Sequence, residues 1–487
     1  MRAIVIAVAS GTLLAACMLG PNYERPAVDV PPKFQYEIAG AVDAGDAAWW
    51  KQFQDPVLDA LVAEALAHND NIRIAVANLE QAAGVFTQTR SPLFPQVGYG
   101  GSAARSRTVE PNLPPDLAAL VPNPESAYQI GLTASWEIDF WGRIRRLTEA
   151  ARANVLATEE ARRGVILSLV ASVTTNYLQL RGLDAQLVIA KQTLDAYGES
   201  LKLFNLQFQY GQISQMNVAQ VQSQYETAAA QIPQIESQIA QTQNALSILL
   251  GRNPGAIERG KTIDQLALPN VPAGVPSELL ERRPDLRQAE QTLIAANAQI
   301  GAAKALYFPT ISLTGALGTA SNDLSKLFSG PARVWSYAGQ LTGPIFTFGA
   351  TSGQVAQAEA ARDAALWNYR LSIQNAFGDV DNALVASQKL QDQLAAQGRL
   401  VAALKDYSRL AKLQYDAGYV PYSTVLQADQ SLFPAELTLA SVRTSMFASS
   451  ANIYKAMGGG WVTTADAMSN SAVPLPSADV LAKPPLN

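Results

Sequence analysis

The sequence of 487 residues predicts an α+β membrane protein in which two copies of one unit combine amphipathic strands with very long helices. Three observations predict this fold. Motifs recur at a constant offset along the chain. Four short segments alternate apolar and polar residues, as strands with one apolar face do. Two further segments run for 67 residues with heptad spacing and without proline, which predicts helices far longer than those of globular proteins.

The repeat is visible in pairs of glycines and in a Phe-Pro motif. Phe94-Pro95 recurs as Phe308-Pro309, at an offset of 214 residues. Further along, the offset is 207 for three glycine pairs: Gly142 and Gly349, Gly211 and Gly418, Gly251 and Gly458. We therefore predict two copies of one structural unit, at residues 61–251 and 277–458, with a seven-residue difference between Phe-Pro and Gly142.

The N-terminus has the pattern of an exported lipoprotein. Residues 1–16 combine a positive start with an apolar stretch too short to span a bilayer, which is typical of a signal peptide. Leu14-Ala15-Ala16-Cys17 has the form of a bacterial lipobox, in which cleavage precedes the cysteine and acyl chains are attached to it. An ordinary signal peptide with an incidental cysteine is the alternative. We predict that Cys17 is lipidated and that residues 17–60 lead into a wrap around the middle of the molecule.

Four strands are predicted, at about residues 92–107, 126–140, 308–319 and 334–347. Residues 128–139 alternate strictly, with Tyr128, Ile130, Leu132, Ala134, Trp136 and Ile138 on one face. A half-buried soluble sheet and a membrane barrel share this signature. Because about eight strands are needed to close a small barrel, four membrane strands would have to be shared between subunits.

Long helices follow each strand pair, at residues 143–209 and 350–416. In the first helix, Ile166, Val173, Leu180, Leu187, Leu194, Leu201 and Phe208 recur every seven residues. The second helix keeps this row but has Ser387 and Ser408 at two of its positions. At 1.5 Å per residue, a helix of 67 residues spans about 100 Å. Such a rod suits a device that spans the cell envelope.

Gly211 and Gly418 are suited to end these helices. Each is followed by a short polar turn and a return helix, at residues 214–250 and 423–457. Three Pro-rich stretches, at residues 21–32, 252–276 and 474–485, are predicted to be irregular and to wrap the middle of the rod. Residues 459–487 are predicted to form a C-terminal tail at the same level.

The composition excludes several function classes. A net charge of −5 and a pI near 5.2 give no basic surface for nucleic acid. One cysteine excludes a Cys-based zinc site, and one histidine, His68, excludes His clusters. His68 lies in a polar context and is predicted to be an exposed surface residue. We expect no cofactor and no metal.

The motifs together resemble the TolC-like outer-membrane efflux channels, in particular the lipoprotein branch that serves resistance–nodulation–division pumps. The resemblance covers residues 14–461 and rests on the lipobox, both Phe-Pro sites and these stretches: "GPNYERP", "WWKQFQDPVLDALVAEAL", "FWGRIRR", "PIFTFG", "RRPDLRQAE" and "YKAMGGGW". It implies a homotrimer with a twelve-stranded β-barrel in the outer membrane and an α-helical barrel in the periplasm. It also implies a periplasmic adaptor and an inner-membrane pump as partners, and a passive exit duct without enzymatic activity.

The resemblance places the gate and the adaptor-docking tip at the two helical turns. The expected docking residues are Gly211, Ser214, Gly418 and Tyr419. The expected gate residues are Tyr415, Ser423, Gln427, Gln430, Asn217 and Gln220. Two family positions that often carry aspartate are amides here, Gln427 and Asn217, while Asp429 follows two residues later on another helix face. A ring of amides at these positions would lack the negative charge that a ring of aspartates carries.

Two other functions remain as alternatives. A passive uptake porin would share the barrel but has no use for helices of about 100 Å. A structural coiled-coil lipoprotein would share the rods but not four amphipathic strands. A hydrolase is less favoured than either, because the sequence has a single histidine and no Gly-x-Ser-x-Gly motif.

Overall fold

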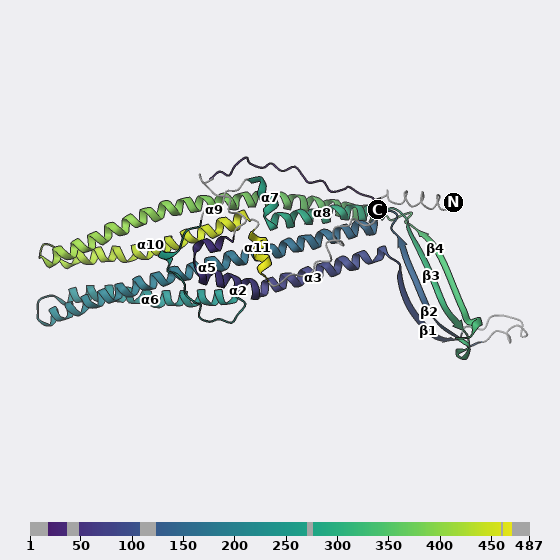
Figure 1. The fold of residues 1–487 in the computed structure, drawn as a ribbon, viewed down its shortest axis with the longest axis horizontal. Coiled ribbons are helices and arrows are strands. Elements are labelled where there is room, and N and C mark those ends of the chain that lie inside the picture. The colour runs from purple at the N-terminus through teal and green to yellow at the C-terminus, as the bar shows by residue number, and fades with distance from the viewer. Residues whose placement is uncertain (1–17, 37–47, 108–122, 270–275, 459–460, 470–487) are drawn as a thin grey trace, which may run out of the picture.

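The computed structural model describes residues 18–36, 48–107, 123–269, 276–458 and 461–469. The chain is strongly elongated, with a four-stranded sheet at one end and two helical hairpins at the other (Figure 1). Long helices connect the two ends, so that the sheet and the hairpin turns are the parts of the chain farthest apart.

Each half of the chain runs through helices, two strands, a long helix, a turn and a return helix. The first half contains α2 (Pro56–His68), α3 (Asp70–Arg90), β1 (Gln96–Ser106), β2 (Glu125–Ile138), α5 (Arg143–Gln209) and α6 (Gln215–Leu249). The second contains α7 (Leu279–Arg282), α8 (Pro284–Ala305), β3 (Thr310–Ser321), β4 (Arg333–Thr342), α9 (Ala350–Asp416) and α10 (Tyr422–Met457). Short 3₁₀ helices lie at Trp49–Phe53, Ser91–Leu93, Ile263–Gln265, Pro276–Glu278, Leu324–Lys326 and Gly330–Ala332, and α11 (Trp461–Met468) follows the second half.

The fourth strand is shorter than the sequence predicts. It was expected to reach residue 347 but ends at Thr342, because Gly343 and Pro344 follow and proline has no N–H to donate to a neighbouring strand. The connections between strands account for the seven-residue difference between the two copies. The connection from β1 to β2 has 18 residues (107–124), and that from β3 to β4 has 11 (322–332).

The sheet places all four apolar rows on one face. Its order is β1-β2-β3-β4, with every neighbouring pair antiparallel. Leu132 lies opposite Tyr99 on one side and Leu317 on the other, and Leu317 lies opposite Trp335. Because opposite residues share a face, the alternation predicted from the sequence forms one continuous apolar surface. Tyr99 is 92% exposed and Trp335 is 70% exposed, so nothing in the described residues covers this face.

The long helices α5 and α9 have 67 residues each and the bounds expected from the sequence. Each begins after a glycine with positive φ, Gly142 or Gly349. Among the described residues, no helix is both long enough and apolar enough to cross a bilayer.

The heptad rows of α5 are buried in only part of the helix. Near the middle, Ile166, Val173 and Leu180 are fully buried, as predicted. Toward the turn, Leu187, Leu194 and Leu201 are half-buried and Phe208 is 44% exposed, so the predicted row is fully buried only near the middle of the helix. By contrast, Tyr197 and Phe204 are buried in the distal half of the same helix. The reason is that the middle of α5 is enclosed by several elements, whereas its distal half packs mainly on the return helix α6.

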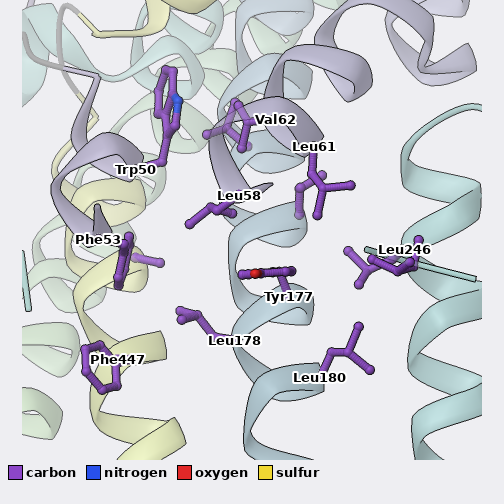
Figure 2. Packing of buried hydrophobic residues seen from close by; sticks show 14 of the residues in the cluster. Trp50, Phe53, Leu58, Leu61, Val62, Tyr177, Leu178, Leu180, Leu246 and Phe447 are labelled. Atoms are coloured by element: carbon purple, nitrogen blue, oxygen red, sulfur yellow. The ribbon is translucent and has the colours of Figure 1, made fainter. Parts of the chain in front are cut away.

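The main core lies halfway along the rod and joins distant parts of the chain. Figure 2 shows Tyr177, Leu178 and Leu180 of α5 packed between Leu58 and Leu61 of α2, Leu246 of α6 and Phe447 of α10. At the same level, Trp49 stacks on Tyr454 with ring centroids 5.1 Å apart, and Trp461 packs edge-on against Trp49 and Trp50.

The connecting segment after α6 is fixed to this core by hydrogen bonds. The Tyr177 hydroxyl donates to the Asp55 carboxylate at 2.7 Å and accepts from the Gly260 N–H at 3.0 Å. The same carboxylate accepts from the Lys261 N–H at 3.1 Å. A Cβ atom at position 260 would overlap Asp55, so glycine permits this close approach. The segment therefore packs irregularly against the middle of the rod.

The N-terminal segment 18–36 runs along α8 and α9 (Figure 1). Arg25 pairs with Glu281 at 2.5 Å and with Glu290 at 2.8 Å, and the Gln35 N–H donates to Asp381 at 3.0 Å. At its start, Met18 packs directly against Gly142, at the junction between β2 and α5.

Candidate functional site: the helical tip

The two turns at the far end of the rod have the same construction. Gly211 and Gly418 adopt positive φ of 71° and 78°, a conformation that costs little only for glycine. The Gln212 N–H donates to the Gln207 carbonyl, and the Tyr419 N–H donates to the Gln414 carbonyl, each at 2.9 Å. These bonds satisfy carbonyls at the helix end in a Schellman arrangement. Both turns are thus compact and defined by their backbones.

The turn residues predicted to dock a partner are exposed. Gly211, Ser214, Gly418 and Tyr419 all lie on the surface, and Tyr419 is 82% exposed. A Cβ atom at either glycine would meet nothing within 4 Å. The tip therefore presents two small, uncovered loops.

An aromatic cluster holds the two hairpins together just behind the turns. Phe204 of α5 is fully buried, and its ring centroid lies 4.1 Å from that of Tyr422 at the start of α10. Tyr415 of α9 packs edge-on against Tyr422 at 5.1 Å. Val221 of α6 and Leu426 of α10 complete the cluster. Tyr415 therefore contacts the neighbouring helix α10 of its own hairpin, and through Tyr422 it is connected to Phe204 of α5.

The polar residues predicted to line the gate differ in their surroundings. Ser423, Gln427 and Gln430 are exposed along one side of α10, and Gln220 is exposed on α6. Asn217 is half-buried, and its side-chain oxygen accepts a hydrogen bond from the Ser214 hydroxyl at 2.5 Å. Asn217 thus braces its own turn, whereas the three residues of α10 and Gln220 are free to face a space outside the chain.

Sequence reasoning missed the pairing of Asp429 with Ser408. The Ser408 hydroxyl of α9 donates to the Asp429 carboxylate of α10 at 2.5 Å. Burial raises the pKa of Asp429 above its usual value, and the hydrogen bond from Ser408 and the charge of Lys412 oppose this shift. The available signal for the pairing was a serine at an apolar heptad position, because its hydroxyl can hydrogen-bond to a polar group on the facing helix.

Ser408 and Asp429 belong to the lining of a cavity between the hairpins. Its volume is about 540 Å³, and α5, α9 and α10 form its walls. Tyr197, Phe204, Lys412, Tyr422, Asp429 and Glu436 are among the residues that line it. Burial also raises the pKa of Tyr197, which is therefore neutral at physiological pH. The hairpins accordingly meet across a partly open groove rather than a continuous core.

Two predictions concern residues away from the tip. His68 is exposed at the end of α2, as predicted. Cys17, the predicted lipidation site, lies outside the described residues.

Comparisons with known proteins agree with this geometry. The chain is 37% identical over 454 residues to the cation efflux system protein CusC of Escherichia coli O6:H1, covering 92% of this chain and 96% of the relative. It is 37% identical over 462 residues to the toluene efflux pump outer membrane protein TtgI of Pseudomonas putida, covering 92% and 96%. The solved CmeC outer membrane channel of Campylobacter jejuni superposes with a TM-score of 0.85 at 26% identity, covering 93% of this chain and 99% of that one.

The family described as outer membrane efflux protein matches residues 61–252 and 275–459, nearly the bounds of the two copies. The fold is likewise that of the solved outer-membrane channels, with long helices joined to a small antiparallel sheet. From these matches, this chain is a member of the outer membrane efflux protein family.

Proposed function

We propose that three copies of this chain form the exit duct of a tripartite efflux system. The observation that carries this proposal is a four-stranded sheet with one continuous exposed apolar face and two outer strands, β1 and β4, each paired on one side only. Four strands are too few to close around a lumen, whereas three copies supply twelve. The apolar face would then contact lipid, and the polar face would line the lumen.

The helices support the same proposal. A length of about 100 Å carries the conduit far from the sheet. An uptake porin gives no reason for such helices, and a structural lipoprotein gives no reason for the sheet. Membership of a family of efflux channels supports a conduit rather than an enzyme.

The tip is the proposed gate and docking site. The exposed turns at Gly211, Ser214, Gly418 and Tyr419 are placed to contact a periplasmic adaptor, which would connect the duct to an inner-membrane pump. Exposed amides at Gln220, Gln427 and Gln430, together with Ser423, would line the constriction. Tyr415 and Asn217 would act indirectly, by fixing the hairpins that carry these residues.

Similarity to known efflux proteins does not identify the compounds that this chain transports. One relative is named for cations and another, at the same identity, for toluene. A wide aqueous duct makes few specific contacts with its cargo, so the pump is the expected source of selectivity.

Lipidation of Cys17 is part of the proposal. Met18, the first described residue, lies at the junction of β2 and α5. The described residues that follow Cys17 therefore start at the level where the strands begin, which supports attachment to the membrane at this end of the molecule. Labelled fatty acid should be incorporated into the wild-type protein and not into Cys17→Ser, and equal labelling of both would refute the modification.

The proposed function is tested by accumulation of efflux substrates in cells that lack this chain. Expression of the wild-type chain should lower accumulation only when the genes of its pump and adaptor are present. Purified protein should also form ion-conducting channels in planar bilayers. Higher accumulation whether or not the pump is present would favour the uptake porin, and unchanged accumulation in both strains would favour the structural lipoprotein.

A further inference from the structure

The cavity of about 540 Å³ between the hairpins lies inside one chain, next to the aromatic cluster of the tip. At this level the helices lie in the contact order α6, α5, α10, α9, so the space between α5 and α10 is away from both edges of the chain. Sites for small organic molecules have volumes of about 300–1,000 Å³. The cavity is therefore large enough for such a ligand, and its lining determines which chemical class fits.

Aromatic rings form much of the wall of this cavity. The five rings belong to Tyr197, Phe204, Tyr415, Tyr422 and Phe433. They come from α5, α9 and α10, and thus from both hairpins. The face of an aromatic ring attracts cations, and several rings around one space are a common arrangement for binding quaternary ammonium groups. The wall therefore favours a cation that carries apolar groups.

Acidic side chains outnumber basic ones among the described residues that line the cavity. The acidic residues are Glu199, Asp416, Asp429 and Glu436, and the basic residue is Lys412. Two of the four carboxylates have lysine partners outside the lining: Glu199 pairs with Lys202 and Glu436 with Lys405, each at 2.8 Å. Within the described part of the chain, Asp416 and Asp429 have no such partner. The cavity thus keeps a negative charge.

Asp429 is the carboxylate best placed to meet a cationic ligand. Its Oδ1 accepts the hydrogen bond from the Ser408 hydroxyl at 2.5 Å, and no described residue donates a hydrogen bond to its Oδ2. Burial raises the pKa of Asp429, because the charged form is poorly solvated in this position. A carboxylate of this kind, beside aromatic rings, interacts best with a cation that brings apolar surface with it.

We propose that this cavity binds a small organic cation of the quaternary ammonium class, with its charge beside Asp429 and its apolar groups against the rings of Tyr197 and Phe433. The site deepens the proposed function and rests on it, because the ligand would contact both hairpins of the proposed gate at once. A ligand that binds only one arrangement of a protein stabilises that arrangement. The bound cation would therefore hold the hairpins together and lower the conductance of the channel.

A proton and the cation would compete for the same carboxylate. The other titratable groups that line the cavity are Tyr197 and Glu199 of α5, Lys412 and Asp416 of α9, and Tyr422 and Glu436 of α10. Binding of the cation should weaken as pH falls through the raised pKa of Asp429, because the protonated carboxyl carries no charge. This pH dependence should be lost in Asp429→Asn.

Isothermal titration calorimetry of the purified chain with benzyltrimethylammonium tests the site. The wild type should bind this probe at neutral pH. Asp429→Asn removes the charge but keeps the shape of the side chain, and it should bind the probe about tenfold more weakly. Asp195→Asn is the matched control, because Asp195 is an exposed carboxylate of α5 that does not line the cavity. Its affinity should equal that of the wild type.

A second pair of variants tests the aromatic wall. Tyr197→Leu replaces a ring by an aliphatic side chain and should weaken binding about threefold to tenfold. Tyr225→Leu is its control, because Tyr225 of α6 contacts α5 near Gly198 but does not line the cavity. Benzenesulfonate, which has the same ring and the opposite charge, should not bind. Equal affinity of the wild type and Asp429→Asn for benzyltrimethylammonium, or equal binding of benzenesulfonate, would overturn the site.

Single-channel recordings in planar bilayers separate the failure of this site from the failure of the proposed function. The probe should lower the conductance of the wild type and of Asp195→Asn and leave that of Asp429→Asn unchanged. An equal decrease in all three would place the probe outside the cavity and overturn its effect on the gate. Channels that conduct but bind no probe would overturn only the site. A chain that forms no channels would overturn the proposed function, whatever the calorimetry gives.

Discussion

An arginine at position 132 tests which face of the sheet meets lipid. Leu132 lies in the middle of β2, opposite Tyr99 of β1 and Leu317 of β3, and its side chain is half-exposed in the single chain. If the apolar face contacts lipid, Leu132→Arg places a charge close to the midplane of the bilayer. Such substitutions cost about 2–4 kcal/mol on the lipid face of a barrel. That cost lowers the ratio of folded to unfolded protein by roughly 30- to 700-fold per chain, at about 1.4 kcal/mol for each factor of ten.

The neighbouring residue supplies the control. Thr133 points to the polar face, opposite Gly98 and Ala316, where small neighbours leave room for a long side chain. Thr133→Arg should therefore cost much less, because its guanidinium group would remain in the water of the lumen. Urea unfolding of both variants in lipid vesicles, followed by tryptophan fluorescence, gives the two free energies of unfolding. Equal costs, or a larger cost at position 133, would show that the face assignment is wrong.

Four further predictions concern helix packing and the tip. Gly182 faces Thr444 across the contact of α5 with α10, so Gly182→Ala should lower the free energy of unfolding by about 1–3 kcal/mol, whereas Gly164→Ala, in open space, should not. Phe204→Ala should remove about 3–5 kcal/mol of packing between the hairpins and raise single-channel conductance in planar bilayers. Gln427→Asp should raise cation preference in reversal-potential measurements, because three carboxylates would lie at one level, and an unchanged preference would place residue 427 outside the pore. Because the pKa of Asp429 is raised, the packed tip is most stable with this carboxyl protonated and loses that contribution as pH rises through the raised pKa. The Asp429 carboxyl shares its cavity with Ser408, Lys412, Tyr197 and Glu436. Single-channel conductance of the wild type should therefore fall on acidification. In Asp429→Asn, which cannot ionise at this position, conductance should stay low at every pH.

The fold could be predicted from the sequence to a large extent because its signals are local and repeated. Strict alternation in residues 128–139 identified not only a strand but the face it shares with three other strands. The glycines at 211 and 418 identified the turns because few other residues accept a positive φ. In both cases, the local backbone conformation determines which kind of residue suits each position.

Other features depend on neighbours that no local pattern specifies. The exposure of Phe208 could not be predicted, because its heptad row is the same as that of the buried Ile166 and Val173. The difference comes from the number of helices around each part of α5. Likewise, the bond from Ser408 to Asp429 joins two helices whose relative rotation the sequence does not state. Tyr415 was correctly placed at the tip, but its contact with Tyr422 needed the turn geometry.

The aromatic cluster at the middle of the rod has a consequence for the biogenesis of the protein. Trp49 and Trp50 enter the chain early, whereas their partners Tyr454 and Trp461 are made much later, and Trp49 and Trp461 are 412 positions apart. Assembly of the sheet also depends on residues made later, because Leu132 of β2 can pair only after Leu317 of β3 has been synthesised. Contacts between such distant residues form slowly and only after the intervening chain is available. A nascent or truncated chain that lacks Trp461 would keep its early tryptophans uncovered, and exposed apolar surface of this kind directs incomplete chains to chaperones and proteases. Survival of the chain in the cell thus depends on the synthesis of Tyr454 and Trp461, which cover Trp49 and Trp50 in the middle of the rod.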